Sequence, residues 1–482
     1  MVKSCNVESR ENRSFVRLES TVNNSKTLSS HPSWQQGQHL DLDITDLSDS
    51  GDGVGRWQNR VVFVPNTVPG DRVTVRLTRV KPRYANAKLQ NILSPSGDRI
   101  RPRCIVADKC GGCQWQHIED SLQHQAKCQQ IRQAFERIGG FEDVEIAPIL
   151  TGDSALHYRN KATYPLGVGQ QGNIQAGYYR PRSHDLINLN QCPVQDERLN
   201  PLLQNVKLDL QQHPWPIYDE SRHQGKLRHL ALRIGRRTGE TLLTLISTDE
   251  DLPGLRGQAQ AWLQTYPQLV GVALNINPHP TNVIFGDQTT CVAGKPYLQE
   301  IFGGLTFQLR PETFFQVNTE AAEALLNQII ADLALQGHEI LLDAYCGIGT
   351  FSLPLARYVR QVVGLERQGA SVQQARINAQ INNITNARFY EGAVEKEIMQ
   401  LEAIPDVVLL DPPRKGCDRA TVNALLEQQP QKIIYISCKP ATQARDLKLL
   451  CEGDRYELIK LQPADFFPQT SHVESAAFLR LR

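Results

Sequence analysis

The sequence has no run of about 20 apolar residues, the length that a helix needs to cross a bilayer, so we expect no membrane span. Its N-terminus, MVKSCNVESRENRS, also lacks the apolar segment of a secretory signal. The eleven cysteines are scattered along the chain, and we interpret them as metal ligands, catalytic thiols or core residues rather than as a disulfide framework. These absences together predict a protein of the reducing cytoplasm.

The chain also lacks an excess of charge of one sign, since its formal net charge is only +1. The local distribution is less even. Residues 72–103 contain nine Lys and Arg but a single acidic residue, Asp98. A second stretch without acidic residues contains Arg222, Lys226, Arg228, Arg233, Arg236 and Arg237. Clustered basic residues are typical of nucleic-acid binding, although a solvated surface carries them as well.

The pattern of apolar residues divides the chain into several parts. Residues 1–35 are polar and without period, which is typical of a disordered tail. In residues 36–95, short alternating runs are separated by turn signals such as SGDG and VPG, and they predict a small OB-like β-barrel. Residues 96–315 mix strands, loops and helical stretches, and they predict an α+β central domain. Within it, an apolar spacing that ends at Ile138 predicts a helix over residues 119–138.

From residue 316 to the end, strand-like and helix-like stretches alternate. The strand-like runs are EILLDAYCG, QVVGLE, ARFYEG, DVVLLDPP and KIIYISC. Such alternation predicts a doubly wound, Rossmann-like parallel sheet over residues 316–482. The last two runs, RYELIKLQPADFF and AAFLRLR, have no helix between them, so we expect an antiparallel hairpin at the edge of this sheet.

The motif LLDAYCGIGTFSL, residues 341–353, has the pattern of a cofactor-binding turn. Asp343 ends a strand, while Gly347 and Gly349 allow a tight turn and a close approach of the backbone to a ligand. Glu366 ends the next strand at a distance that suits the hydroxyls of a bound ribose. Because no third glycine stands in the dinucleotide register, the turn favours S-adenosylmethionine over NAD. A glycine pair alone would be explained equally well by a structural turn.

A second motif, VVLLDPPRKG at residues 407–416, contains a strand that ends in Asp411. Asp411 and the two prolines after it form a rigid platform beside the expected cofactor. Methyltransferases that act on amino groups carry an aromatic residue after the prolines, where this chain has Arg414, so amine methylation is disfavoured. The alternative interpretation is a simple turn at the end of a strand.

A third motif, IIYISCKP, places Cys438 at the carboxyl end of a strand, where open α/β sheets carry their sites. Carbon 5 of uracil is a weak nucleophile until a thiolate adds to carbon 6, and a base must later remove the proton from carbon 5. Glu474, in SHVESAAF, is a candidate for that base. The alternatives are a buried core cysteine and a surface glutamate. Cys417 is the rival nucleophile, and we rank it lower because it follows a loop glycine.

The motifs FFQVN, DAYCGIGTFSL, GLE, DPPRKG, ISCKPAT and HVES occur in an order that resembles the RNA 5-methyluridine methyltransferases. The resemblance extends from about residue 36 to residue 482 and is nearest to the iron–sulfur-containing branch that acts on 23S ribosomal RNA. It implies an S-adenosylmethionine methyltransferase domain in which Cys438 is the nucleophile and Glu474 the base. It implies that the cofactor contacts Gln316, Tyr345, Glu366 and Asp411. It also implies that the barrel is an RNA-binding TRAM domain.

A group of cysteines stands apart from these motifs. Cys104, Cys110 and Cys113 lie close together in RPRCIVADKCGGCQWQ, and Cys192, followed by proline, is the natural fourth member. Four thiolates could hold zinc or an iron–sulfur cluster, and the spacing alone does not choose between them. Three cysteines merely buried together are the plainer alternative. The family resemblance implies a 4Fe–4S cluster, which we expect to shape the RNA-binding part of the protein.

The sequence as a whole predicts a monomeric enzyme that methylates carbon 5 of a uridine in RNA, with 23S ribosomal RNA as the expected substrate. The target base would be flipped out of its stack, with Phe314 or Phe315 as a candidate stacking partner. One alternative is a transfer-RNA enzyme with the same chemistry, a branch that typically lacks the barrel and the cysteine group. The other is a non-enzymatic iron–sulfur RNA-binding protein, which would not need Cys438, Glu474 and Asp411 together.

Overall fold

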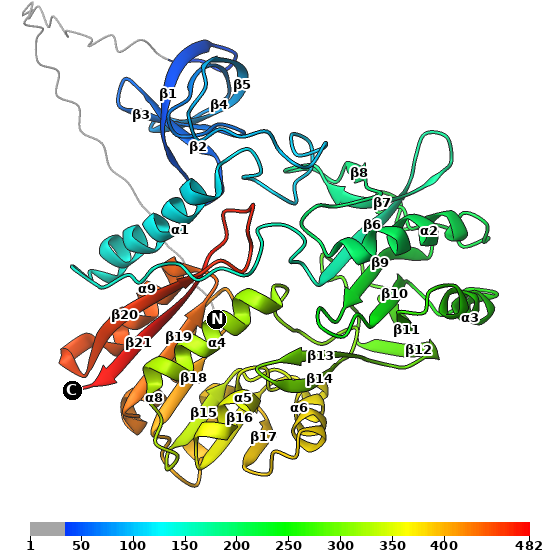
Figure 1. The fold of residues 1–482 in the computed structure, drawn as a ribbon. Helices are drawn as coiled ribbons and strands as arrows, with labels where there is room; N and C mark the ends of the chain where they lie inside the picture. Colours follow the sequence, from blue (N-terminus) through cyan, green and yellow to red (C-terminus); the bar gives the residue numbers. More distant parts are fainter. Residues whose placement is uncertain (1–33) are drawn as a thin grey trace, which may run out of the picture.

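The structure, a computed structural model, describes residues 34–482 and arranges them as three units that follow one another along the chain (Figure 1). A small barrel precedes a central mixed sheet, and an α/β unit completes the chain. This arrangement confirms the predicted fold class. The predicted tail lies outside the described residues, apart from residues 34 and 35. No helix in the described part of the chain is long and apolar enough to traverse a bilayer.

Five strands close the N-terminal barrel in the order β1-β2-β3-β5-β4. They are β1 (His39–Leu47), β2 (Gly53–Trp57), β3 (Arg60–Val64), β4 (Arg72–Val80) and β5 (Tyr84–Ser94). Leu40, Leu42 and Ile44 of β1 are buried in alternation with exposed neighbours, as a strand with one face inside a barrel requires. Trp34 is buried as well and stacks on Trp57 with 6.1 Å between the ring centroids, so it belongs to the barrel.

The central unit is a seven-stranded sheet in the order β12-β11-β10-β9-β6-β7-β8, in which only β10 and β11 pair in parallel. Its strands are β6 (Lys161–Val168), β7 (Ile174–Tyr179), β8 (Leu186–Asn188), β9 (Leu227–Ile234), β10 (Thr241–Ser247), β11 (Leu269–Ile276) and β12 (Gln288–Gly294). Helices α2 (Asn200–Leu210) and α3 (Leu255–Thr265) pack against it, and a 3-10 turn, Glu197–Leu199, precedes α2. Leu202, Leu245 and Trp262 belong to the core between these layers.

Helix α1 (Asp120–Ala134) precedes the central sheet in sequence but packs against α9 (Pro440–Leu450) and β20 (Tyr456–Ala464) of the C-terminal unit (Figure 1). It continues into a π-helical turn, Phe135–Gly139, which extends the predicted helix to its expected end. Phe135 is buried, but Ile138 is 43% exposed. A π turn adds a residue to each turn, and the chain rotates Ile138 away from the packed face.

The C-terminal sheet has the order β17-β16-β15-β18-β19-β21-β20. Its parallel strands are β15 (Ile340–Ala344), β16 (Gln361–Glu366), β17 (Ala387–Glu391), β18 (Val407–Leu410) and β19 (Lys432–Ser437). The predicted edge hairpin is present as β20 with β21 (Glu474–Leu481), and β21 pairs antiparallel to β19. The strand order reverses between β15 and β18, which is where open α/β sheets bind their ligands.

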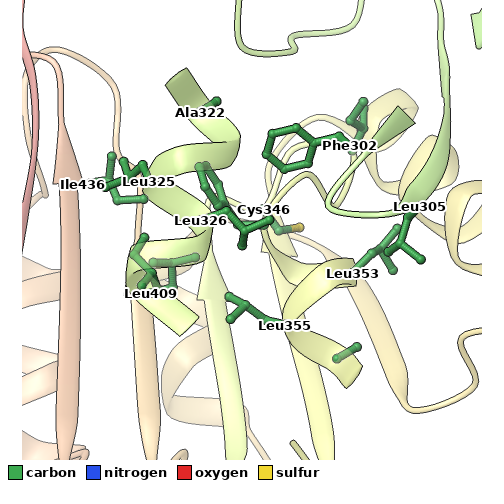
Figure 2. Close-up of a cluster of buried hydrophobic side chains, with 14 of the residues drawn as sticks. Phe302, Leu305, Ala322, Leu325, Leu326, Cys346, Leu353, Leu355, Leu409 and Ile436 are labelled. Atoms are coloured by element: carbon green, nitrogen blue, oxygen red, sulfur yellow. The ribbon is translucent and has the colours of Figure 1, made fainter. Parts of the chain in front are cut away.

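Helices cover both faces of this sheet, as alternation of strands and helices requires (Figure 1). They are α4 (Thr319–Leu333), α5 (Ser352–Leu355), α6 (Gly369–Ile381), α7 (Val394–Glu397), α8 (Arg419–Gln428) and α9, with 3-10 turns at Ala356–Tyr358, Ile398–Gln400 and Glu452–Asp454. A hairpin of β13 (Leu298–Phe302) and β14 (Leu305–Leu309) packs into the hydrophobic core between α4 and this sheet. Figure 2 shows part of this core, with Leu325 of α4 on the side of Ile436 and Leu409 of the sheet and Leu326 on the side of Phe302 of the hairpin.

Candidate active site

A cavity of about 650 Å³ opens at the carboxyl ends of the parallel strands. Both catalytic residues predicted from the sequence and five of the seven predicted cofactor contacts line it. These residues are Gln316, Tyr345, Gly347, Glu366, Asp411, Cys438 and Glu474. Motifs that are far apart in the sequence therefore meet in one place. Gln316 lies in the segment that leads into α4, and each of the other residues lies at or beside the end of a strand of the C-terminal sheet.

The turn after β15 forms one wall of the cavity. Tyr345 adopts a left-handed backbone with φ of 75°, which is uncommon for a residue with a side chain and is typical of functional sites. Gly347 has φ of 56°, and its N–H donates to Glu366 Oε2 at 3.2 Å. A Cβ atom added to Gly347 would meet no protein atom within 4 Å. Glycine at this position therefore allows the left-handed backbone conformation, and the space above the turn is open.

Asp343 and Gly349, the other two predicted cofactor contacts, do not line the cavity. Asp343 is buried beneath the turn, where its carboxylate accepts a hydrogen bond from the Ser352 hydroxyl. Burial, with a smaller contribution from the nearby Glu366, raises the pKa of Asp343 to about 7. A Cβ atom on Gly349 would lie 3.0 Å from Leu353. The structure therefore gives both residues a part in shaping the turn.

Two carboxyl groups face the cavity from neighbouring elements, and Glu474 is buried whereas Asp411 is half-buried. Asp411 follows β18, and burial raises its pKa to about 7, with a further contribution from Asp343. Glu474 begins β21, and burial, followed by the charge of Asp411, raises the pKa of Glu474 well above its usual range. A carboxylate with a raised pKa is a stronger base than an ordinary one, as removal of a proton from carbon requires.

Cys438 follows β19 and is half-buried at the cavity wall. Burial raises the pKa of its thiol, and the charge of Glu474 adds to this effect. A hydrogen bond with the Arg414 side chain acts in the opposite direction and favours the thiolate. The only proline in the motif, Pro440, is the first residue of α9, so a helix begins two residues after Cys438.

Arg414 and His472 are among the side chains of this site that sequence reasoning missed. Arg414 lines the cavity, and its place three residues after Asp411 in DPPRKG is the local signal that indicates it. His472 lines the cavity two residues before Glu474, and its Nδ1 lies 3.4 Å from Arg414 Nη2. His472 also packs edge-on against Phe467, with 5.9 Å between the ring centroids. No local pattern in the sequence indicates that contact.

The rival nucleophile and the two candidate stacking partners differ in how deeply they are buried. Cys417 is buried in the core outside the cavity, and burial raises its pKa to about 12, so it lacks the access and the acidity of a nucleophile. Phe315 is also buried, whereas Phe314 is 65% exposed at the cavity wall. As expected for one of this pair, Phe315 packs in the core, and only Phe314 is free to stack on a base.

The four cysteines of the separate group line a second cavity of about 130 Å³. Gly111 lies between them, and a Cβ atom there would be 2.8 Å from the Tyr179 carbonyl oxygen, so the loop requires glycine. Burial raises the pKa of Cys113 to about 12 and also raises the pKa of Cys192. Within residues 34–482, no group of three or more His, Cys, Asp or Glu side chains is placed to hold a metal ion as it stands. The four thiols share one cavity without closing around a single point.

Two parts of the chain match known families. Residues 303–482 match the family described as tRNA (Uracil-5-)-methyltransferase, and residues 33–89 match the TRAM domain. The chain is 64% identical over 448 residues to an uncharacterized RNA methyltransferase of Nostoc sp., a match that covers 93% of this chain and 97% of that protein. A second such protein, from Synechocystis sp., is 55% identical over 456 residues, covering 95% of this chain and 98% of its own.

A solved structure agrees with these relatives. The chain is similar to the Pyrococcus abyssi tRNA (uracil-54, C5)-methyltransferase, which was crystallised in complex with S-adenosyl-L-homocysteine. The two are 27% identical with a TM-score of 0.74, and the match covers 91% of this chain and 99% of that one. The similarity thus extends well beyond the C-terminal sheet. With its barrel, central sheet and cavity, this chain belongs to the RNA uracil-5 methyltransferases that carry an N-terminal TRAM domain.

Proposed function

We propose that the protein transfers a methyl group from S-adenosyl-L-methionine to carbon 5 of a specific uridine in 23S ribosomal RNA. The observation that carries the reaction is the meeting of Cys438, Glu474 and Asp411 in one cavity with the strained turn of β15. A protein that only bound RNA would not need a thiol, a buried base and a cofactor turn in the same place. The non-enzymatic alternative is therefore disfavoured.

The donor set of the cavity suits S-adenosyl-L-methionine. Glu366 offers a carboxylate for ribose hydroxyls, and the space above Gly347 admits the ligand close to the backbone. We assign Gln316, Tyr345 and Asp411 as further contacts, because they line the same cavity. The Pyrococcus relative holds S-adenosyl-L-homocysteine, the demethylated form of this cofactor. When bound, the cofactor supplies an electrophilic methyl group.

The residues of the chain would then act in sequence on the uracil. The Cys438 thiolate, favoured by Arg414, adds to carbon 6 and forms a carbon–sulfur bond, which makes carbon 5 nucleophilic. After carbon 5 has gained the methyl group, Glu474 takes its proton. The electron pair of that C–H bond re-forms the double bond between carbons 5 and 6, and the thiolate leaves.

Two classes of RNA are candidate substrates, 23S ribosomal RNA and transfer RNA. The 23S proposal is supported by the resemblance of the ordered motifs and the cysteine group to the ribosomal branch. Transfer RNA is favoured by the Pyrococcus enzyme, which is named for a tRNA uridine and aligns with 91% of this chain. A match of that extent includes a counterpart of most of the barrel, so the barrel does not separate the two RNA classes.

Mapping of 5-methyluridine in cells with and without the gene tests the proposal. Loss of one or more modified uridines from 23S ribosomal RNA alone is the expected result. A loss confined to transfer RNA would replace the ribosomal substrate by the second candidate. If both RNAs kept every 5-methyluridine, the proposed activity would be wrong.

We further propose that Cys104, Cys110, Cys113 and Cys192 hold a 4Fe–4S cluster. Their shared cavity of about 130 Å³ is several times the space that one water occupies, so a lone ion would leave most of it empty. Thiolates are the usual ligands of such clusters. The cluster would tie the loop around Cys113 to the segment of Cys192 before the central helix α2.

Protein purified without oxygen should be brown and contain about four irons per chain. Cys192→Ser should lose the iron, because a hydroxyl is a poor ligand for the cluster, while Cys291→Ser should keep it, because Cys291 lies on β12 outside the cavity. Iron and zinc are measured by mass spectrometry. Stoichiometric zinc without iron would reject the cluster, and unchanged iron in Cys192→Ser would exclude this residue as the fourth ligand.

The barrel is expected to contribute affinity for RNA and no chemistry. Arg79, Lys81 and Arg83 are exposed at the β4–β5 turn, beside the edge-on pair of Phe63 and Tyr84. Replacing the three basic residues by Gln should weaken RNA binding about 10-fold or more at low salt and reduce its salt dependence, because fewer counterions are released. Binding is measured across a salt series. An unchanged affinity and slope would mean that these residues form a solvated surface only.

A further inference from the structure

The loop of residues 465–473, here named the active-site loop, joins β20 to β21 and ends beside Glu474. Two of its side chains, Phe467 and His472, line the active-site cavity. His472 in turn lies beside Arg414, whose positive charge lowers the pKa of the Cys438 thiol. The loop thus forms the wall of the cavity next to the nucleophile, and its placement fixes the space that a flipped uracil would occupy.

The contacts that hold this loop come from the N-terminal half of the chain. Lys127 of α1 is fully buried, and its Nζ lies 2.6 Å from Asp465 Oδ1. The same Nζ donates to the Phe467 carbonyl oxygen at 3.1 Å. A buried ion pair gives little stability compared with apolar residues of the same volume, whereas it does impose one geometry. An ion pair at this position is therefore better explained by placement of the loop than by stability.

Gln469, in the middle of the loop, is held on both sides. Its N–H donates to Gln123 Oε1 at 3.0 Å, and Gln123 Nε2 donates to Gln469 Oε1 at 3.3 Å. Its carbonyl oxygen accepts the N–H groups of Gln114 and Trp115, which directly follow the third cysteine of the cluster site. Gln469 has φ of 69°, a conformation that a residue with a side chain keeps only where its surroundings impose it.

Two further hydrogen bonds tie the loop on either side of Gln469. The Tyr158 hydroxyl donates to the Pro468 carbonyl oxygen at 3.0 Å, and the Ser471 hydroxyl donates to the Asp49 carbonyl oxygen, in the barrel unit, at 2.8 Å. The sheet register alone fixes Glu474, through its pairing with Ala464. It does not fix Phe467 or His472, which depend on the contacts from outside the sheet.

We propose that Lys127 and Gln123 are positioning residues of the methyl-transfer reaction. By holding the active-site loop, they keep Phe467 and His472 at the distance from Cys438 that the uracil ring requires. This inference rests on the proposed function, because it concerns capture of the base by the nucleophile. Misplacement of a cavity wall by about 1 Å can cost on the order of 100-fold in rate without any change in the reacting groups.

The test uses the full-length protein and RNA with 5-fluorouridine at the target, which traps the covalent complex because fluorine does not leave as a proton does. Lys127→Met alone leaves the buried Asp465 without its lysine partner, with His124 Nε2 at 3.5 Å beside its carboxylate. The main variant is therefore the double change Lys127→Met with Asp465→Leu, which removes both charges of the buried pair. It should fold and bind RNA like the wild type, but form the adduct about 10- to 100-fold more slowly. Gln123→Leu, which removes hydrogen bonds and no charge, should slow the adduct about 5-fold.

Lys207→Met is the matched control. Lys207 is also buried, but it donates only to Asn188, Leu189 and Asn190 of the central unit. The adduct rate should stay at the wild-type value in this variant, and the rates are compared below the melting temperature of every protein. Wild-type rates in both the double variant and Gln123→Leu would overturn the positioning role, as would an equal loss in Lys207→Met. Failure of the wild type itself to form an adduct would instead overturn the proposed function.

Discussion

Replacing Cys438 by Ala is expected to abolish methylation, with a loss of turnover on the order of 10⁴-fold or more, because in the proposed reaction its thiolate forms the first bond to the uracil. The side chain is half-buried and makes its contacts at the cavity wall, so the fold and the affinity for RNA should remain. Methyl transfer is measured with labelled cofactor. Adduct formation is measured with 5-fluorouridine RNA by denaturing electrophoresis, where Cys438→Ala should give no shifted band.

Cys417→Ala is the matched control for this prediction. Cys417 is buried among core residues, so its loss should lower the free energy of unfolding by about 1 kcal/mol and leave the adduct intact. Peptide mapping of the wild-type adduct should identify Cys438. Attachment at Cys417 would overturn the assignment of the nucleophile. Full methylation by Cys438→Ala would return that cysteine to a packing role.

Elements with a strong local pattern could be predicted from the sequence. The alternation of strands and helices after residue 316 predicted the parallel sheet and its edge hairpin, because each element carries its own apolar period, whereas the order of the strands across the sheet was not predicted. The helix that ends near Gly139 was also predicted, but exposure of Ile138 was not, because a π turn changes the period locally. Burial of Trp34 was missed too, since its partner Trp57 is remote in sequence.

The candidate active site likewise contains features that local motifs predicted and features that depend on contacts between distant segments. The glycine turn and DPPRKG are local signals, and the structure brings both to one cavity. Asp343 belongs to the same motif but lies beneath the turn, which spacing alone does not reveal. The active-site loop was not predicted at all. Its contacts join Lys127 to Asp465, which are separated by more than 300 residues, and no pattern within either segment indicates the other.

Replacing Glu474 by Gln should fail in a different way from Cys438→Ala. The amide keeps the size of the side chain but cannot take a proton, so release should slow by about 10²- to 10⁴-fold. The negative charge of Glu474 raises the pKa of Cys438, and its removal should make the thiolate easier to form. Addition and methyl transfer therefore continue while release stops. A methylated protein–RNA adduct should accumulate on ordinary uridine, where the wild type shows none.

The variant Asp411→Asn tests whether Asp411, rather than Glu474, is the base that takes the proton from carbon 5. Asp411 also lines the cavity, and burial raises its pKa to about 7, so a raised proton affinity alone does not identify the base. If Asp411 serves the cofactor, its amide variant should bind S-adenosyl-L-methionine more weakly and accumulate no adduct. The wild-type release rate should fall as the pH is lowered, because the raised pKa of Glu474 leaves it protonated over a wider range. A methylated adduct in Asp411→Asn, or normal turnover in Glu474→Gln, would give the role of base to a group other than Glu474.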